Sequence, residues 1–174
     1  MLSIIKIITP KRTGAAAAFI LAIITSLVIF IWPNAHQYRQ ALLIDAALRG
    51  YTGRMKLLLA FGANADEPAC QSDSCFPPIV WAALAEEPSA VELLLDHGAN
   101  VNRKPRRGAT ALTAAAFHGD TETVKLLLSR GADINSDLDG CTPLGLAKLR
   151  KHAEVVNLLS KQGANRDGDC ESFW

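Results

Sequence analysis

The sequence lacks the short motifs on which common catalytic sites are built. It contains no Gly-x-Ser-x-Gly nucleophile turn, no phosphate-binding glycine loop and no His-Glu-x-x-His metal motif. Its four histidines are scattered, at His36, His97, His118 and His152. We therefore expect no enzyme activity, no bound metal or cofactor and no small-molecule substrate.

A strongly basic domain is also missing. The 174 residues contain 18 Lys+Arg and 17 Asp+Glu, for a net charge of +1. Three of the bases (Lys6, Lys11 and Arg12) lie in the first 32 residues, which carry no acid, so 15 bases face 17 acids in the remainder. Because nucleic-acid-binding domains are usually strongly basic, we expect no nucleic-acid partner.

Charged side chains are absent from residues 14–32. A helix of this length, at about 1.5 Å per residue, comes close to spanning the roughly 30 Å hydrocarbon core of a bilayer. A buried core helix and a cleaved signal peptide are the alternatives. The run is longer than the usual signal-peptide core of about 7–15 residues, and Ala35, with Pro33 two residues before it, is a poor cleavage site. We expect an uncleaved transmembrane helix.

Positive charge is unevenly distributed around this span. Lys6, Lys11 and Arg12 precede it, and Arg39 is the first base after it. The positive-inside rule then places residues 1–13 in the cytoplasm and the rest of the chain outside it, in the periplasm if the source is a Gram-negative bacterium. Residues 33–40 would form a short linker that holds the following domain close to the membrane.

A Gly-Ala-Asn/Asp turn recurs four times after this linker. It begins at Gly62, Gly98, Gly131 and Gly163, at spacings of 36, 33 and 32 residues, and each turn follows a leucine-rich run. A period in this range indicates a repeat array. Each unit has a first helix, a polar turn and a second, amphipathic helix that ends at a glycine suited to the left-handed conformation. Such short helices must stack on neighbouring units to bury their apolar faces.

The fourth unit shows the pattern most fully, as Gly140-Cys141-Thr142-Pro143-Leu144 through Gly163-Ala164-Asn165. It resembles the ankyrin repeat, and the resemblance covers roughly residues 41–167, divided into units 41–66, 67–102, 103–135 and 136–167, with a tail at 168–174. The resemblance implies an all-α, helix-turn-helix solenoid with short hairpin fingers, here preceded by one transmembrane helix. It also implies a non-catalytic protein-binding role.

The units depart from the family pattern at one position. The family's histidine in Thr-Pro-Leu-His is replaced by Ile44, Val80, Thr113 and Gly145. That histidine normally supports the turn through hydrogen bonds, so we expect these repeats to be less stable than typical ones. The first unit also lacks the Thr-Pro start, as is usual for a terminal repeat.

The end of each first helix is the first candidate for partner binding. In ankyrin-like folds this end faces the concave groove, and the four units place there an apolar side chain each: Leu48, Leu84, Phe117 and Leu149. Arg49, His118 and Arg150 lie beside them. The stripe could pack between repeats; alternatively, it forms a groove for an apolar or amphipathic segment of another protein.

A basic finger between the second and third units is the second candidate. It contains Arg103, Lys104, Arg106 and Arg107. A charged finger is often only a solvated surface. The functional alternative is that it attracts an acidic partner or anionic lipid headgroups.

Four cysteines complete the set of candidate residues. Cys70 and Cys75 lie in the first finger, which is longer than the others, and outside the cytoplasm a disulfide between them would staple this loop. A Cys141–Cys170 bridge is less favoured, because neighbouring repeats lie about 10 Å apart and a disulfide needs Cα atoms within about 7 Å, unless the C-terminal tail bends inward. Four free thiols in a cytoplasmic protein are the alternative.

Together these features predict a membrane-tethered, non-catalytic module that presents ankyrin-like repeats to another protein outside the cytoplasm. Two alternatives remain open. One is an immunity or inhibitor-type protein that binds an extracytoplasmic toxin or enzyme. The other is an accessory factor in envelope stress or oxidant defence. The sequence does not name the partner.

Overall fold

The computed structural model describes residues 35–71, 74–105, 109–165, 167–168 and 170. Residues 39–174 belong to one compact unit and residues 1–38 to another. The predicted transmembrane residues 14–32 lie outside the described part of the chain. Within that part, no helix is both long enough and apolar enough to cross a membrane.

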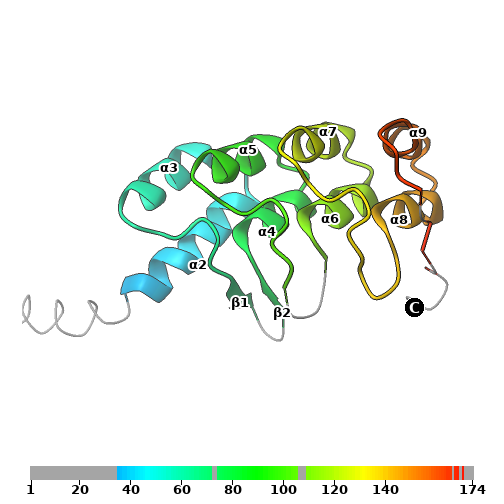
Figure 1. Ribbon diagram of the computed structural model, residues 1–174. Coiled ribbons are helices and arrows are strands. Elements are labelled where there is room, and N and C mark those ends of the chain that lie inside the picture. The colour runs from blue at the N-terminus through cyan, green and yellow to red at the C-terminus, as the bar shows by residue number, and fades with distance from the viewer. Residues whose placement is uncertain (1–34, 72–73, 106–108, 166, 169, 171–174) are drawn as a thin grey trace, which may run out of the picture. The chain divides into compact units, whose positions relative to one another are not determined.

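The described helices alternate between two layers (Figure 1). The first helices of the repeats are α2 (Ala35–Leu48), α4 (Pro78–Leu84), α6 (Ala111–His118) and α8 (Pro143–Leu149). The second helices are α3 (Thr52–Ala60), α5 (Pro88–Asp96), α7 (Thr121–Ser129) and α9 (Ala153–Lys161). Neighbours within each layer pack together: α4 on α6 and α6 on α8, then α3 on α5, α5 on α7 and α7 on α9. The prediction of a helical repeat fold is confirmed.

Helix α2 begins earlier than the sequence suggested. Residues 35–40, which we expected to be part of a linker, form its first turns. Arg39 Nη1 donates a hydrogen bond to the carbonyl oxygen of Phe61 at 3.0 Å. The Gln40 side chain is 3% exposed, and its Nε2 donates to the carbonyl oxygen of Asn64 at 2.9 Å. These contacts with the end of the first unit make Arg39 and Gln40 part of the repeat.

The core between the layers combines small and large side chains. Paired alanines of the first helices, such as Ala82-Ala83 and Ala114-Ala115, are buried and allow neighbouring helices to approach closely. Leucines fill the space from the second layer. Leu94, Leu127 and Leu159 occupy the same position in successive repeats, four residues before the turn glycine, and all are fully buried.

The Gly-Ala-Asn/Asp turns have the predicted backbone conformation. The four turn glycines have φ values of +86°, +85°, +84° and +95°, in the left-handed region that favours glycine. The Asn or Asp side chain that follows accepts a hydrogen bond from the backbone N–H two residues later. This bond is 2.9 Å long from Asp66 to Asn64 and 2.9 Å from Asn102 to Asn100. The equivalent bond from Asn135 to Asp133 is 3.0 Å long, so the first three turns are each closed locally by their own side chain.

A second set of hydrogen bonds joins one turn to the next. Asp66 Oδ1 accepts the backbone N–H of Asn100 at 3.0 Å, and Asn102 Oδ1 accepts that of Asp133 at 2.7 Å. At the start of the array, Gln40 Oε1 accepts the N–H of Asn64 at 3.2 Å. Gln40 thus provides for the first unit the acceptor that the preceding repeat provides for the second and third.

The first finger is a hairpin that projects from the helices (Figure 1). Its strands β1 (Ala69–Gln71) and β2 (Ser74–Phe76) are antiparallel, and the register pairs Cys70 with Cys75. Cys75 is disulfide-bonded. Residues directly opposite in an antiparallel pair have Cα atoms about 4.5–5.5 Å apart, within the roughly 4.4–6.8 Å that a disulfide spans. The register therefore favours the Cys70–Cys75 bridge, which stays a prediction.

Threonine side chains cap two of the first helices, α6 and α8. Thr113 Oγ1 donates a hydrogen bond to the carbonyl oxygen of Thr110 at 2.9 Å, and Thr110 Oγ1 accepts the N–H of Thr113 at 3.2 Å. In the fourth unit, Thr142 Oγ1 accepts the N–H of Gly145 at 3.2 Å. Both threonines therefore act as helix N-caps, as the Thr-Pro pattern predicts. The expected lower stability of the repeats remains a prediction.

Candidate protein-binding surface

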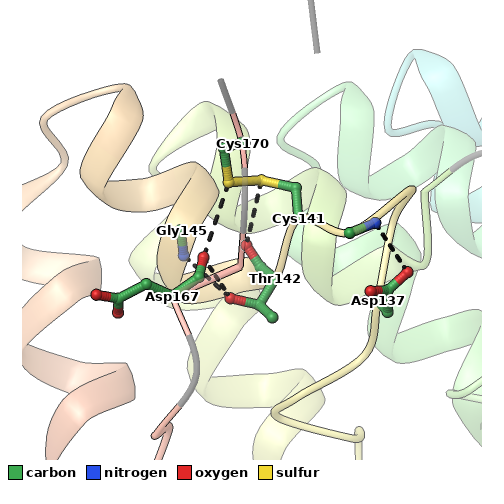
Figure 2. The surroundings of a disulfide bond; sticks show 7 residues. Asp137, Cys141, Thr142, Gly145, Asp167 and Cys170 are labelled. Atoms are coloured by element: carbon green, nitrogen blue, oxygen red, sulfur yellow. Dashed lines mark hydrogen bonds between the residues drawn. A yellow bond between two sulfur atoms is a disulfide. The ribbon is translucent and has the colours of Figure 1, made fainter. Parts of the chain in front are cut away.

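The C-terminal tail folds back over the start of α8 (Figure 2). Cys141 and Cys170 form a disulfide with a Cα–Cα distance of 4.8 Å. Thr142 Oγ1 donates to the carbonyl oxygen of Asp167 at 3.0 Å, and Lys148 Nζ lies 2.7 Å from Asp167 Oδ1. The pairing that repeat spacing made less favoured is thus present, because the tail bends inward and brings Cys170 within reach.

Gly145 leaves room for this tail, and replacing it tests how tightly the tail is packed. A Cβ at position 145 would collide with the Asp167 carbonyl oxygen and lie 2.6 Å from Cys170 Sγ. We expect Gly145→Ala to lower the free energy of unfolding by about 1–3 kcal/mol, measured by urea denaturation, because the overpacked backbone must shift.

Gly53→Ala is the matched control for this substitution. Gly53 lies in α3, and an added Cβ there meets nothing within 4 Å. Alanine is favoured over glycine inside a helix by about 0.5–1 kcal/mol, so this variant should be at least as stable as the parent chain. Equal stability changes in the two variants would contradict the predicted packing of the tail.

The predicted groove stripe is only partly accessible. Leu48, Leu84 and Phe117 are half-buried, whereas Leu149 is 39% exposed. Leu84 packs against the main core. Phe117 packs against a smaller buried cluster, whose members are Leu138, Cys141, Leu146 and Cys170. Leu84 and Phe117 therefore contribute to packing, and Leu149 is the stripe's most accessible member.

A cation lies directly on the half-buried Phe117. The Arg150 guanidinium carbon is 4.5 Å from the centroid of the Phe117 ring, within the range of a cation–π contact. Leu149, Arg150 and Lys151 are all exposed. We call Phe117, Leu149, Arg150 and Lys151 the groove patch. It combines apolar, aromatic and positively charged groups at the adjacent ends of α6 and α8.

The other polar residues beside the stripe already have partners. The His118 Nδ1 atom lies 3.5 Å from Glu86 Oε1, and His152 Nε2 is 3.0 Å from the Phe117 carbonyl oxygen. Asp45 Oδ1 lies 2.8 Å from Arg49 Nε, and this hydrogen bond, together with the charge of Asp45, raises the pKa of the Arg49 guanidinium. Arg49 and His118 therefore each lie beside a carboxylate, whereas Arg150 and Lys151 of the groove patch form no ion pair within the described part of the chain.

In the basic finger, one arginine is paired with a carboxylate of the preceding unit. Arg103 Nη1 lies 3.5 Å from Asp66 Oδ2 of the preceding unit, and Lys104 is exposed. Arg106 and Arg107 lie outside the described residues. In the part of the chain that is described, no group of three or more His, Cys, Asp or Glu side chains could hold a metal ion. The binding roles predicted for the finger and the stripe stay predictions.

One apolar surface was missed in the sequence. Leu42, Leu57 and Phe61 are 55%, 61% and 71% exposed, and with Leu58, Asp45 and Arg54 they line a hollow of about 300 Å³. We call Leu42, Arg54, Leu57 and Phe61 the end face. Phe61 was the available signal, because the residue before the turn glycine is polar in the other units: His97, Arg130 and Gln162.

Stacked helix pairs, inter-turn hydrogen bonds and a projecting hairpin define a helical-repeat protein of the kind that binds other proteins. A family model described as ankyrin repeats (3 copies) matches residues 79–170. The chain belongs to the ankyrin repeat family. These repeats are generally non-catalytic and serve protein–protein interaction, so the expected binding role is supported at this level.

The chain is similar to parts of proteins with different names and from different organisms. Inversin of Gallus gallus is 39% identical over 95 residues, covering 54% of this chain and 9% of that protein. The E3 ubiquitin-protein ligase KEG of Arabidopsis thaliana is 32% identical over 131 residues, covering 73% and 8%. Protein PhlB of Serratia liquefaciens is 38% identical over 87 residues, covering 49% and 38%. The chain thus spans well under half the length of each relative.

Proposed function

We propose that this protein is a membrane-tethered, non-catalytic module that binds another protein through the groove patch. The observation that carries the proposal is the contact between Arg150 and the Phe117 ring, next to the exposed Leu149. Aromatic and arginine side chains are enriched among the residues that dominate binding energy at protein interfaces. The ring is held by the buried cluster beneath it, so the patch is rigid before the partner arrives.

The chemistry of the patch favours an amphipathic, acidic segment as the partner. Arg150 and Lys151 are exposed cations, and the nearby Lys148 is neutralised by Asp167 at 2.7 Å. Leu149 offers an apolar contact between the charges. A partner segment with carboxylates beside an apolar side chain would match both features, and its charge would also speed association.

The membrane and compartment parts of the proposal are supported by independent features. Residues 14–32 carry no charge, and Lys6, Lys11 and Arg12 precede them, which favours a cytoplasmic N-terminus. The Cys141–Cys170 disulfide favours an oxidising compartment for the repeats. We infer that the repeats lie outside the cytoplasm, in the periplasm if the source is a Gram-negative bacterium.

An immunity or inhibitor-type protein is a second candidate that would use the same surface. The exposed cations of the groove patch and Lys104 of the basic finger suit an acidic extracytoplasmic toxin or enzyme. One acidic partner recovered in stoichiometric amount would favour this function. A deletion phenotype under oxidant or envelope stress, without such a complex, would favour an accessory role in defence.

The groove patch can be tested with a double charge variant. Leu149→Asp with Arg150→Glu should reduce partner recovery at least about tenfold, because it removes the apolar contact and reverses a central charge. The measurement is a pull-down of the full chain from detergent-solubilised membranes. The variant's melting temperature should be close to that of the parent chain, since both positions are exposed.

Lys125→Glu is the matched control for this experiment. Lys125 is exposed on α7 in the second layer of helices, away from the first-helix ends, so the substitution changes charge without touching the groove patch. The control should recover the partner as well as the parent chain does. Full recovery by the double variant would rule out the groove patch as the binding surface.

A further inference from the structure

We propose that the end face of the first unit lies against the headgroup region of a lipid bilayer. This inference rests on the membrane anchor of the proposed function and adds a second membrane contact to it. The repeats would then be held in a defined orientation, rather than joined to the membrane through the chain alone.

The first reason is that the end face is apolar where a solenoid end is usually polar. Terminal repeats normally present a polar outer face for solubility. In the later units, the positions equivalent to Leu57 are Leu93, Leu126 and Leu158, and these are less exposed because each second helix packs on the preceding one. In the first unit, Leu57 and Leu42 remain more than half exposed beside the 300 Å³ hollow. Some other apolar phase should cover them.

The second reason is that repeat packing does not account for Phe61. The equivalent residues His97, Arg130 and Gln162 are exposed and polar, so this position faces solvent throughout the array. Phe61 is 71% exposed, the largest value among the exposed large apolar side chains of the described residues. Phenylalanine and leucine side chains are typical of the apolar faces of elements that lie in the membrane interface, where they enter the boundary between headgroups and acyl chains.

The third reason is the position of Phe61 along the chain. Arg39 Nη1 binds the Phe61 carbonyl oxygen at 3.0 Å, and Arg39 follows Trp32, the last residue of the uncharged run, by seven residues. Even a fully extended chain of that length spans no more than about 25 Å, and the helical turns of α2 shorten it further. The chain between the uncharged run and Arg39 is therefore short, which limits how far the end face can lie from the proposed anchor.

The fourth reason is charge, and it favours lipid over a second copy of the chain. Arg54 and Lys56 are exposed cations of α3, and the nearby Asp45 is already paired with Arg49 at 2.8 Å. Cations beside apolar side chains suit anionic headgroups. In a two-fold dimer formed through this face, the same cations would be brought toward each other, which opposes association.

The test places a photo-crosslinker at Phe61 of the full-length chain. The variant Phe61→p-benzoylphenylalanine is reconstituted into vesicles of phosphatidylcholine and phosphatidylglycerol, irradiated and analysed by intact mass. A lipid adduct is the expected product. Gln162→p-benzoylphenylalanine is the matched control, because Gln162 holds the equivalent exposed position in the fourth unit and should give no lipid adduct.

Alkaline carbonate extraction of the same vesicles separates this inference from the proposed anchor. A chain that resists extraction but gives only a dimer adduct, or no adduct, at position 61 overturns the end-face inference and leaves the anchor intact. Equal lipid adducts at positions 61 and 162 overturn it as well, since the contact would not be specific. A chain released by carbonate would overturn both proposals.

Discussion

Loss of the Cys141–Cys170 disulfide is expected to lower the free energy of unfolding by about 2–4 kcal/mol. The bond joins residues 29 positions apart, and the intervening segment includes the fourth repeat. Both cysteines are buried against Leu138 and Leu146, so opening the bond also frees the tail from a packed site. The variant is Cys141→Ala with Cys170→Ala, measured by urea denaturation.

The first finger provides the control for this experiment. Cys70 and Cys75 are five positions apart, so a bond between them restricts the unfolded chain much less. Cys70→Ala with Cys75→Ala should therefore change stability less than the C-terminal pair does. Alkylation of the native protein, with and without reductant, gives an independent count of thiols by mass. Four reactive thiols without reductant would contradict the predicted disulfides.

Leu127→Ala is expected to cost about 2–5 kcal/mol, the usual range for a fully buried leucine. Leu127 is fully buried in the core, on α7 between α5 and α9. The cavity left by the substitution would weaken the contacts of the third repeat with both of its neighbours. Because repeat arrays depend on such nearest-neighbour contacts, the loss should also broaden or split the unfolding transition. Urea denaturation followed by circular dichroism measures both effects.

Leu57→Ala removes the same atoms from the end face and serves as the comparison. Leu57 is 61% exposed, so in detergent-free buffer its loss should change stability by no more than about 0.5 kcal/mol. A cost similar to that of Leu127→Ala would mean that the end face is packed in the folded chain. That result would conflict with the exposure on which the membrane contact was inferred.

The local features of each repeat were predictable because they depend on few neighbouring residues. A left-handed turn after a leucine-rich helix favours glycine, and Thr110 or Thr142 before a helix can accept a backbone N–H of its own first turn. The start of α2 was not predictable in the same way. Residues 35–40 carry no repeat signal, and Gln40 joins the first unit through bonds to residues 24 and 27 positions away.

The candidate surfaces also combine features that the sequence predicted with features that depend on contacts between distant residues. The repeat spacing located Phe117 and Leu149 at equivalent places in the array, but it could not reveal that Phe117 is half-buried by the C-terminal cluster. Phe61 was visible in the alignment of turns as the one apolar residue before a glycine. The proposed membrane contact of Phe61 depends on the exposure of its side chain. That exposure is set by how the units pack and not by the residue type.

The sequence by itself determined that this is an ankyrin repeat protein, with helices, caps and turns at regular intervals, because each element obeys rules that act over a few residues. The tertiary structure alone decided how the array ends. Gln40 replaces a missing repeat at one end, and the tail closes over Gly145 at the other. Both ends depend on contacts between residues far apart in the chain, for which no local pattern exists, and both lie beside the surfaces proposed to bind.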